Sequence, residues 1–204
     1  EWGPKLWELQ LAGDSGAVGR WGIEGHTGGL VAAGVGGPIT GRGAHVAIID
    51  DPFKNYEEAA SETIREKVLN WYRSTLRTRL APGGAIILVM TRWHEKDLAG
   101  ELEAAMTEED GEQWEIIELP AIAKGNDILG RQPGEPLWPA RYPLTELRAT
   151  QIALGSYLWS ALYQQKPSPA AGNKFKRAWF RYFEIDDEHV VLHTPGEEQE
   201  RKRV

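Results

Sequence analysis

Two segments built around uninterrupted apolar runs stand out in the hydrophobic pattern, at residues 45–50 and 85–90. Runs of this kind are typical of parallel strands that are covered on both faces of a sheet. Between them, over residues 56–80, apolar side chains recur at steps of three and four positions, and acidic residues occupy the first turn. That spacing predicts one long amphipathic helix, which the Pro and Gly residues at 81–84 bring to an end.

The alternation of strand and helix continues beyond the second run. Residues 96–106 fit a helix, and residues 113–119 are a candidate third strand. Strand, helix, strand, helix and strand in this order indicate an α/β fold with a mainly parallel sheet and right-handed crossovers. A Pro- and Gly-rich connecting segment follows at 121–143, and two short helices are predicted at 144–154 and 156–165.

The two ends of the chain differ from this centre in composition. Residues 1–43 hold 13 of the 23 glycines and predict two or three short strands joined by tight turns. Residues 13–20 superficially suggest a phosphate-binding loop, but they lack its Lys and its Mg²⁺-binding hydroxyl, so a glycine-rich surface turn is expected. The last 21 residues, 184–204, are polar and resemble a linker, although the apolar residues 190–192 indicate a strand.

Composition and charge narrow the class of protein. The 204 residues suffice for one full domain, or for one domain with an appendage. A formal net charge of −7 argues against a wholly basic, nucleic-acid-coating surface but permits a local basic patch. Because the chain has no cysteine, disulfide scaffolds, Cys-ligated zinc sites and thiol nucleophiles are excluded. Apolar runs of about six residues are far shorter than the ~20 needed to span a membrane, and no signal peptide is visible.

The candidate chemistry begins with Asp50 and Asp51, at the carboxyl end of the first predicted strand. In open α/β sheets, ligands bind at this edge. One carboxylate there can hold Mg²⁺ together with phosphate oxygens and water, and its neighbour can orient or deprotonate an attacking water molecule. The alternative is that both acids only end the strand before Pro52 and cap a turn. Spacing alone leaves both interpretations open.

A second polar group, Thr91 and Arg92, follows the other apolar run. If the two strands are neighbours, Thr91 lies level with the two aspartates and can sense the γ-phosphate of a nucleotide. Arg92 can then neutralise phosphate charge; the alternative is an ordinary polar strand end with a snorkelling Arg. A further arginine, Arg42, stands between two glycines just before the first strand.

Four short blocks, taken in order, make a more specific set: TGRGA (40–44), IIDDPFK (48–54), LVMTRWHE (88–95) and LYQQKP (162–167). With them the sequence resembles the large subunit of tailed-phage terminases, the motor that packages viral DNA. The resemblance extends over residues 20–183. Each block alone is a weak signal, and the set is highly specific.

The resemblance implies a P-loop-type (ASCE) ATPase core that uses ATP and Mg²⁺. Asp50 matches the Walker B aspartate that holds Mg²⁺, and Asp51 stands at the position of the catalytic acid. Thr91 matches the coupling motif, which links the state of the γ-phosphate to DNA movement, and Arg92 beside it is the phosphate-neutralising candidate. Arg42 lies near the place where some members supply an arginine to a neighbouring subunit's ATP.

The same resemblance implies a division of the chain and an incomplete enzyme. Residues 1–120 correspond to the C-terminal half of the ATPase core, residues 121–183 to a small helical linker or lid subdomain, and residues 184–204 to the start of the connection to a downstream nuclease domain. No Gly-x-x-x-x-Gly-Lys-Ser/Thr occurs in the chain, and in the family the P-loop lies upstream of this region. Since the chain also opens on Glu1, we expect part of a longer reading frame that hydrolyses ATP poorly by itself.

Basic residues in two places could contact the backbone of DNA. Arg73, Arg77 and Arg79 lie near the end of the long predicted helix, where they also complement the helix dipole. An aromatic and basic stretch at 174–183 could touch phosphates, or could pack its aromatic side chains onto the core. The pattern leaves both alternatives open in each place.

The partners that the resemblance implies are double-stranded DNA, the portal protein and the small terminase subunit, with large subunits assembled as a homo-oligomeric ring. The implied location is the host cytoplasm, transiently on the procapsid portal, with no membrane contact. Two other functions stay open from the residues alone. One is a metal-dependent nuclease, in which the Asp50–Asp51 pair shares two metals with the acidic pair at 186–187. The other is a non-catalytic docking module with a degenerate ATPase fold.

Overall fold

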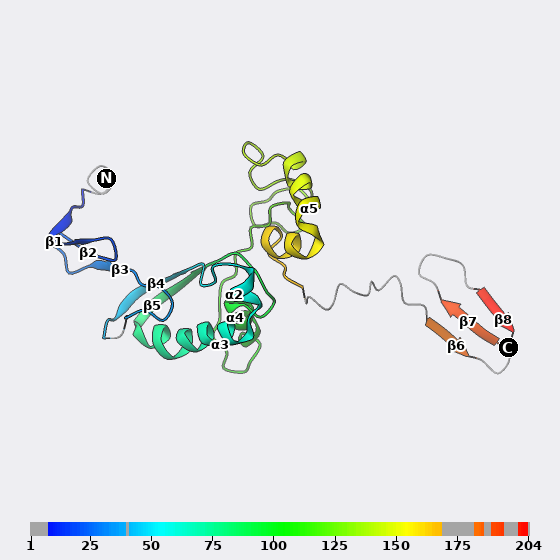
Figure 1. The fold of residues 1–204 in the computed structure, drawn as a ribbon, viewed down its shortest axis with the longest axis horizontal. Coiled ribbons are helices and arrows are strands. Elements are labelled where there is room, and N and C mark those ends of the chain that lie inside the picture. Colours follow the sequence, from blue (N-terminus) through cyan, green and yellow to red (C-terminus); the bar gives the residue numbers. More distant parts are fainter. Residues whose placement is uncertain (1–7, 40, 169–181, 186–188, 194–199, 204) are drawn as a thin grey trace. The chain divides into compact units, whose positions relative to one another are not determined.

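The structure is a computed structural model of the chain, and Figure 1 shows its fold. The residues that it describes are 8–39, 41–168, 182–185, 189–193 and 200–203. The chain divides into two compact units, Glu1–Ile116 and Ile117–Val204. The assignment of residues 1–120 to an ATPase core and of residues 121–183 to a lid stays a prediction.

The first unit opens with a small antiparallel sheet of three strands, in the order β1-β2-β3. Its strands are β1 (Leu11–Ala17), β2 (Arg20–Ile23) and β3 (Gly29–Val31). The prediction of short strands in this Gly-rich region is therefore confirmed. The surface turn predicted for residues 13–20 is wrong in extent, because most of this segment lies in β1 and residues 18–19 alone form the turn into β2.

The two predicted apolar strands, β4 (Ala44–Asp50) and β5 (Leu80–Val89), pair in parallel, which confirms the central prediction for this unit. Their register places Asp50 opposite Val89, so both strands end at the same edge. β5 begins earlier than predicted. Residues 81–84 bulge out between two paired stretches instead of lying outside the strand.

The helical stretch between these strands is broken, which corrects the single helix predicted for residues 56–80. Ser61 makes the break: its backbone is extended (φ −76°, ψ 116°), and its hydroxyl accepts a hydrogen bond from the Ile64 N–H. Serine satisfies the start of a helix better than it continues one. The pieces are α2 (Tyr56–Ala60), α3 (Glu62–Trp71), a π-helical turn η1 (Tyr72–Leu76) and a 3₁₀ turn η2 (Arg77–Arg79).

The core of the first unit lies between one face of β4 and β5 and the helices. The helix predicted at 96–106 is confirmed as α4 (Leu98–Ala105). Figure 1 shows α2, α3 and α4 on one side of the strand pair. Strands, connecting residues and helices all contribute buried side chains to this core: Ile49, Phe53, Ala59, Val68, Tyr72, Leu76, Leu98 and Leu102.

The other face of the strand pair is open in the part of the chain that the structure describes. Its side chains are about half exposed: Val46 (55%), Ile48 (63%), Ile87 (46%) and Val89 (54%). The predicted coverage of both faces is therefore wrong for the described residues. The third strand predicted at 113–119 is also absent, since these residues form neither strand nor helix.

A short polar network closes the end of the helical stretch. The Tyr72 hydroxyl donates to Glu112 Oε2 at 2.7 Å, and Arg77 Nε donates to Glu112 Oε1 at 2.9 Å. Burial, followed by the hydrogen bond to Glu112, raises the pKa of Tyr72 well above its usual range. Arg77 is therefore engaged within this unit, which gives one of the three helix-end arginines a structural partner.

The second unit is built on α5 (Leu144–Leu158) and the π-helical turn η3 (Trp159–Tyr163). Gly155 interrupts α5 with a left-handed φ of 73°. Glycine suits this place because other residues adopt such a conformation only with strain. The helical stretch therefore divides where the sequence predicts it, between 144–154 and 156–165.

Three short strands near the C-terminus form an antiparallel sheet, in the order β6-β7-β8. They are β6 (Tyr182–Ile185), β7 (His189–His193) and β8 (Glu200–Arg203). β7 confirms the strand indicated by residues 190–192. The polar linker expected over residues 184–204 is wrong for the described residues, while the connection to a downstream domain stays a prediction.

An ion pair organises the Pro- and Gly-rich segment at 121–143. Arg131 donates from Nε to Asp127 Oδ1 at 3.0 Å and from Nη2 to Oδ2 at 2.6 Å, and the Asp127 side chain is 1% exposed. Arg131 also donates to the carbonyl oxygens of Pro120 (3.0 Å) and Glu135 (3.3 Å). The hydrogen bonds from Arg131 hold the pKa of Asp127 below its usual value. The pair therefore fixes a segment that has little regular secondary structure.

We expect Phe53→Ala to destabilise the first unit by about 3–5 kcal/mol, because it removes a side chain that is 2% exposed and leaves a cavity. Urea unfolding followed by Trp fluorescence measures the change. Val18→Ala is the control: Val18 is 98% exposed, so its truncation should change the free energy of unfolding by no more than about 0.5 kcal/mol. Equal effects of the two substitutions would contradict the place of Phe53 in the core.

Asp127→Asn should destabilise the second unit at neutral pH, because it removes a carboxylate whose pKa Arg131 lowers in the folded state. A depressed folded-state pKa adds stability above the ordinary value of 3.8, and this stability is lost as the pH falls through the folded-state pKa. The difference in denaturant midpoint between wild type and variant should therefore shrink below about pH 4. Denaturant titrations at neutral and acidic pH measure it, and a difference that persists undiminished in acid would contradict the ion pair.

Candidate functional site

Two carboxylates stand at the carboxyl end of β4. Asp50 is the last residue of the strand, opposite Val89, and it is exposed. The backbone N–H of Asp51 donates to the Val89 carbonyl oxygen at 3.0 Å, which extends the ladder by one bond. Pro52 and Phe53 follow, and both are buried. Because the chain enters the core directly after the acids, the two carboxylates are held at the edge of the sheet.

Asp51 joins the ends of the two strands through its side chain. Its Oδ1 accepts a hydrogen bond from the backbone N–H of Thr91 at 3.0 Å, across 40 positions of sequence. The Asp51 backbone has a φ of 39°, in the left-handed region that residues other than Gly, Asn and Asp rarely adopt. Conformations of this kind persist where the surrounding structure enforces them, and they cluster at functional sites. Thr91 thus lies beside Asp51, while the roles predicted for both residues stay predictions.

Arg92 is bound to protein groups rather than free at this edge. Its Nε donates to both carboxylate oxygens of Asp97, at 2.9 and 3.1 Å, and its Nη1 lies 3.6 Å from Glu103 Oε2. The Arg92 side chain is 14% exposed and that of Asp97 is 0% exposed. The charge of Arg92 is therefore already paired at the N-terminus of α4. Its contact with a phosphate stays a prediction, and that contact would require the pairing to be shared or broken.

Asp97 is the residue at this site that the sequence interpretation does not single out. Its carboxylate accepts hydrogen bonds from the backbone N–H groups of three residues that surround it: Trp93 at 3.0 Å, His94 at 3.3 Å and Gly100 at 3.0 Å. It is also the N-cap of α4. The signal available in the sequence is local, because an Asp directly before the first apolar residue of a predicted helix is a typical N-cap.

His94 belongs to the same turn and contributes no positive charge to it. Its Nδ1 accepts a hydrogen bond from the Lys96 N–H at 3.0 Å. Burial, and then the nearby charge of Arg65, lower the pKa of His94 below its ordinary value of 6.5. The imidazole is therefore neutral at neutral pH, with one of its two nitrogens already occupied.

Arg42 lies away from this edge. It precedes the first residue of β4, whereas Asp51 follows the last, and a strand of 7 residues spans on the order of 20 Å. Arg42 is exposed, and its side chain forms no hydrogen bond or ion pair with any residue that the structure describes. The fold therefore separates Arg42 from Asp50 and Asp51 of its own chain. Its predicted role at a neighbouring subunit's ATP stays a prediction.

The acidic edge offers the kind of ligand that Mg²⁺ prefers. This ion takes oxygen ligands and is usually held by one or two carboxylates together with waters and substrate phosphates. Asp50 is exposed, and the hydrogen bond to Asp51 engages only its Oδ1. Within the described ranges, no group of three or more His, Cys, Asp or Glu residues could hold a metal by itself. A metal ion at this edge would therefore need further ligands from water and substrate phosphates. The acids at 186–187, invoked for the nuclease alternative, lie outside the described residues.

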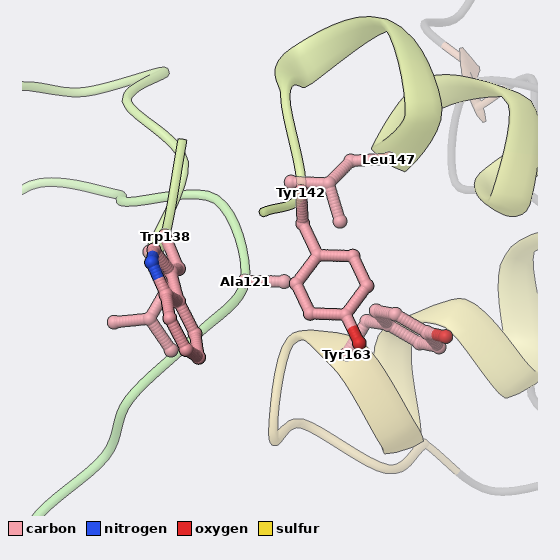
Figure 2. A pocket seen from close by; sticks show the side chains of 6 residues that line it. Ala121, Trp138, Tyr142, Leu147 and Tyr163 are labelled. Carbon is pink, nitrogen blue, oxygen red and sulfur yellow. The ribbon is translucent and has the colours of Figure 1, made fainter. Parts of the chain in front are cut away.

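The second unit contains a cavity of about 450 Å³ with a mainly aromatic and aliphatic lining. Figure 2 shows Trp138 on one side of it, and Tyr142 and Tyr163 on the other. The Arg141 guanidinium lies 5.3 Å from the centre of the Trp138 ring and 5.4 Å from that of Tyr142. The size falls within the range of ligand pockets. Its lining side chains include no carboxylate, imidazole or amine, so the cavity offers no acid–base chemistry comparable to that at the strand edge.

These features define an α/β protein whose candidate site is the acidic carboxyl edge of two parallel strands, the edge at which such folds bind their ligands. The chain belongs to the terminase large subunit family, T4likevirus-type, N-terminal, whose family model matches residues 10–182. The known role of this family is ATP-driven packaging of DNA, in which the large subunit works with a portal and a small terminase subunit. No curated protein matches the chain.

The family match confirms the resemblance to terminase large subunits that the sequence motifs indicate. The match does not distinguish the first half of the ATPase domain from the second, so that finer assignment stays a prediction. As for membranes, no helix within the described residues has the length and apolar character that crossing a bilayer requires.

Asp51→Ala should be less stable than Asp51→Gly by about 1 kcal/mol, although both substitutions remove the hydrogen bond to Thr91. The reason is the φ of 39° at this position, which glycine adopts at little cost and alanine adopts only with strain. Urea unfolding of the two variants, side by side, measures the difference. An alanine variant as stable as the glycine variant would show that the backbone at Asp51 is not left-handed.

Proposed function

We propose that the carboxyl edge of β4 and β5 is the ATP-hydrolysing site of the packaging motor, in a P-loop-type (ASCE) core of which this chain supplies the second half. The observation that carries this proposal is the hydrogen bond from the Thr91 N–H to Asp51 Oδ1 at 3.0 Å. It links the acidic end of one strand to the polar end of its neighbour. A site that converts phosphate cleavage into movement needs a physical link of this kind.

The two aspartates have different tasks at this edge. Asp50, exposed at the end of β4, is the carboxylate that would hold Mg²⁺, and the ion would neutralise charge on the phosphate oxygens. Asp51 orients the attacking water and accepts its proton as the water oxygen bonds to the γ-phosphorus. The bond from that phosphorus to the oxygen bridging it to the β-phosphate breaks, and ADP and inorganic phosphate are the products. Because Thr91 already donates to Oδ1 of Asp51, we assign the water to Oδ2.

Thr91 connects the chemistry to movement in this proposal. Its N–H holds Asp51 in place, and it belongs to the strand end that faces the γ-phosphate. When that phosphate is lost, the hydrogen bond of Asp51 to the attacking water is lost with it, and the hydrogen bond of Asp51 to Thr91 changes in strength. Since the chain runs from Thr91 through a short turn into α4 (Leu98–Ala105), a shift at Thr91 is passed on to a helix.

The two candidate arginines receive separate tasks. Arg92 is paired with Asp97, at 2.9 Å, and serves first to hold the turn after β5. Arg42 is exposed at the opposite end of β4, where it cannot reach Asp50 and Asp51 of its own chain. We therefore assign Arg42 to the ATP of a neighbouring subunit in a homo-oligomeric ring, where a guanidinium stabilises the charge that develops on the transferred phosphoryl group.

The partners in this proposal are double-stranded DNA, the portal protein and the small terminase subunit. The place is the procapsid portal in the host cytoplasm. The endonuclease expected of terminase large subunits is assigned to a separate domain that follows residue 183. The Asp50–Asp51 pair is thereby reserved for ATP hydrolysis.

Asp51→Asn should reduce ATP hydrolysis by the large subunit at least about 100-fold, because an amide cannot accept the proton of the attacking water. The measurement is phosphate release by the large subunit at its natural length, with and without duplex DNA. Asp110→Asn is the control, since Asp110 is an exposed acid in a turn outside the candidate site.

Hydrolysis that rises with DNA and collapses in Asp51→Asn but not in Asp110→Asn supports the proposal. Full turnover in Asp51→Asn would contradict the site. If the wild type shows no turnover even with portal protein and DNA, the non-catalytic docking module becomes the better interpretation of this fold.

A further inference from the structure

Asp97 is a fully buried carboxylate for which the proposed chemistry has no use. Its side chain is 0% exposed. It accepts the single Nε–H of Arg92, shared between its two oxygens, and the backbone N–H groups of residues 93, 94 and 100. A carboxylate has about four lone-pair sites, so the accepting capacity of Asp97 is used up. Its task therefore lies inside the protein and not in binding a ligand.

We propose that Asp97 is a positioning residue, which holds the segment 91–94 on the N-terminus of α4 so that the Thr91 N–H reaches Asp51. It does not touch substrate. The effect on the geometry can be tested by itself, whereas the effect on hydrolysis rests on the proposed function.

The segment that Asp97 holds comes directly after the end of β5. Thr91 donates to Asp51. The next three residues, 92–94, all donate to Asp97, the first through its side chain and the other two through their backbone N–H groups. Both ends of a very short segment are therefore bound, one to the β4 edge and one to α4. The hydrogen bond at Asp51 depends on the anchorage at Asp97.

Gly100 allows this segment to lie directly on the first turn of α4. A Cβ at Gly100 would collide with the carbonyl oxygen of Glu95 and would lie 2.9 Å from Arg92 Nη2. Any larger residue would push the Glu95 backbone and the end of the Arg92 side chain away from the helix. The Arg92 side chain, and Glu95 directly after the segment, therefore lie against the start of α4.

The charge of Asp97 matters as well as its shape. Among the described residues, Arg92 forms one other ion pair, with Glu103 at 3.6 Å, and the Glu103 side chain is 53% exposed. Removing the negative charge of Asp97 leaves a guanidinium that is 14% exposed with a weaker partner, and breaking a buried pair in this way is strongly unfavourable. An Asn can accept at one oxygen only, and its NH₂ group would face other donors. Asp97→Asn therefore loosens the segment with almost no change in volume.

Asp127 provides a matched control in the second unit. Like Asp97, it is a buried aspartate that pairs with an arginine, and its side chain is 1% exposed. It also accepts backbone N–H bonds, from Leu129 at 3.1 Å and from Arg131 at 3.3 Å. It belongs to a different unit from Thr91 and Asp51. Asp127→Asn therefore repeats the chemistry of Asp97→Asn away from the candidate site.

Amide hydrogen exchange, followed residue by residue by NMR on this chain, tests the geometry without any enzymatic activity. In Asp97→Asn, the Thr91 amide should exchange at least about tenfold faster relative to the core amide of Val68, and in Asp127→Asn less than about twofold faster. Asp51→Asn is the positive control, since it weakens the acceptor itself. An unchanged Thr91 amide in Asp97→Asn, with faster exchange at residues 93 and 94 alone, would overturn the proposal.

Steady-state hydrolysis by the full-length large subunit tests the consequence. Asp97→Asn should lower kcat at least about tenfold with KM for ATP changed less than about threefold, whereas Asp127→Asn should leave both within about threefold. Asp127→Asn breaks a comparable buried pair in the other unit, so equal kcat values in the two variants would overturn the positioning role. If Asp51→Asn keeps full turnover, the proposed function has failed, and amide exchange alone decides the inference about Asp97.

Arg92→Lys provides a second route if Asp97→Asn does not fold. Lysine keeps the positive charge, but it has no fixed Nε–H of the kind that Arg92 places between the two oxygens of Asp97. It should therefore also speed exchange at Thr91, by at least about threefold. Exchange at Thr91 that matches the wild type in Arg92→Lys would count against the anchorage.

Discussion

The parallel pairing of β4 with β5 is the constraint on which the candidate site depends. The register that places Asp50 opposite Val89 brings both strand ends to one edge, and the Asp51 N–H adds a further bond to the ladder. A shift of one residue would turn every side chain of a strand to the other face. It would take Ile49 out of the core and move the acids away from Thr91. Burial of one face against the helices therefore selects the register, and the register positions the site.

Around this edge, charged side chains serve two distinct purposes. Asp51 is exposed and uses one oxygen for Thr91, so its other oxygen can bind a group from outside. Asp97 is buried with every accepting position filled, so it can only stiffen the chain around it. The same contrast separates Arg42, which is exposed, from Arg92, which is paired. Burial and the number of bonds already made decide which charged groups remain available for chemistry.

Much of the first unit follows from local patterns, and the exceptions have physical causes. The cores of β4 and β5 and the helix α4 form where apolar runs and helical spacing predict them. The long helix is broken at Ser61, because apolar periodicity can run across a break that a capping hydroxyl creates. Residues 113–119 have the composition of a strand, but a strand forms only where another edge pairs with it, and none does among the described residues.

Local sequence was sufficient to recognise the family and to locate the elements that carry the two aspartates. It was also sufficient to exclude the chemistry that requires cysteine. Only the tertiary structure determined which groups form hydrogen bonds with each other. It pairs Asp51 with Thr91 across 40 positions, and it pairs Arg92 with the buried Asp97 instead of leaving it free at the strand edge. Propensity and periodicity act between neighbours along the chain, so they can be recognised in the sequence. A hydrogen bond needs a donor and an acceptor about 3 Å apart, and packing of distant segments decides which two groups come that close.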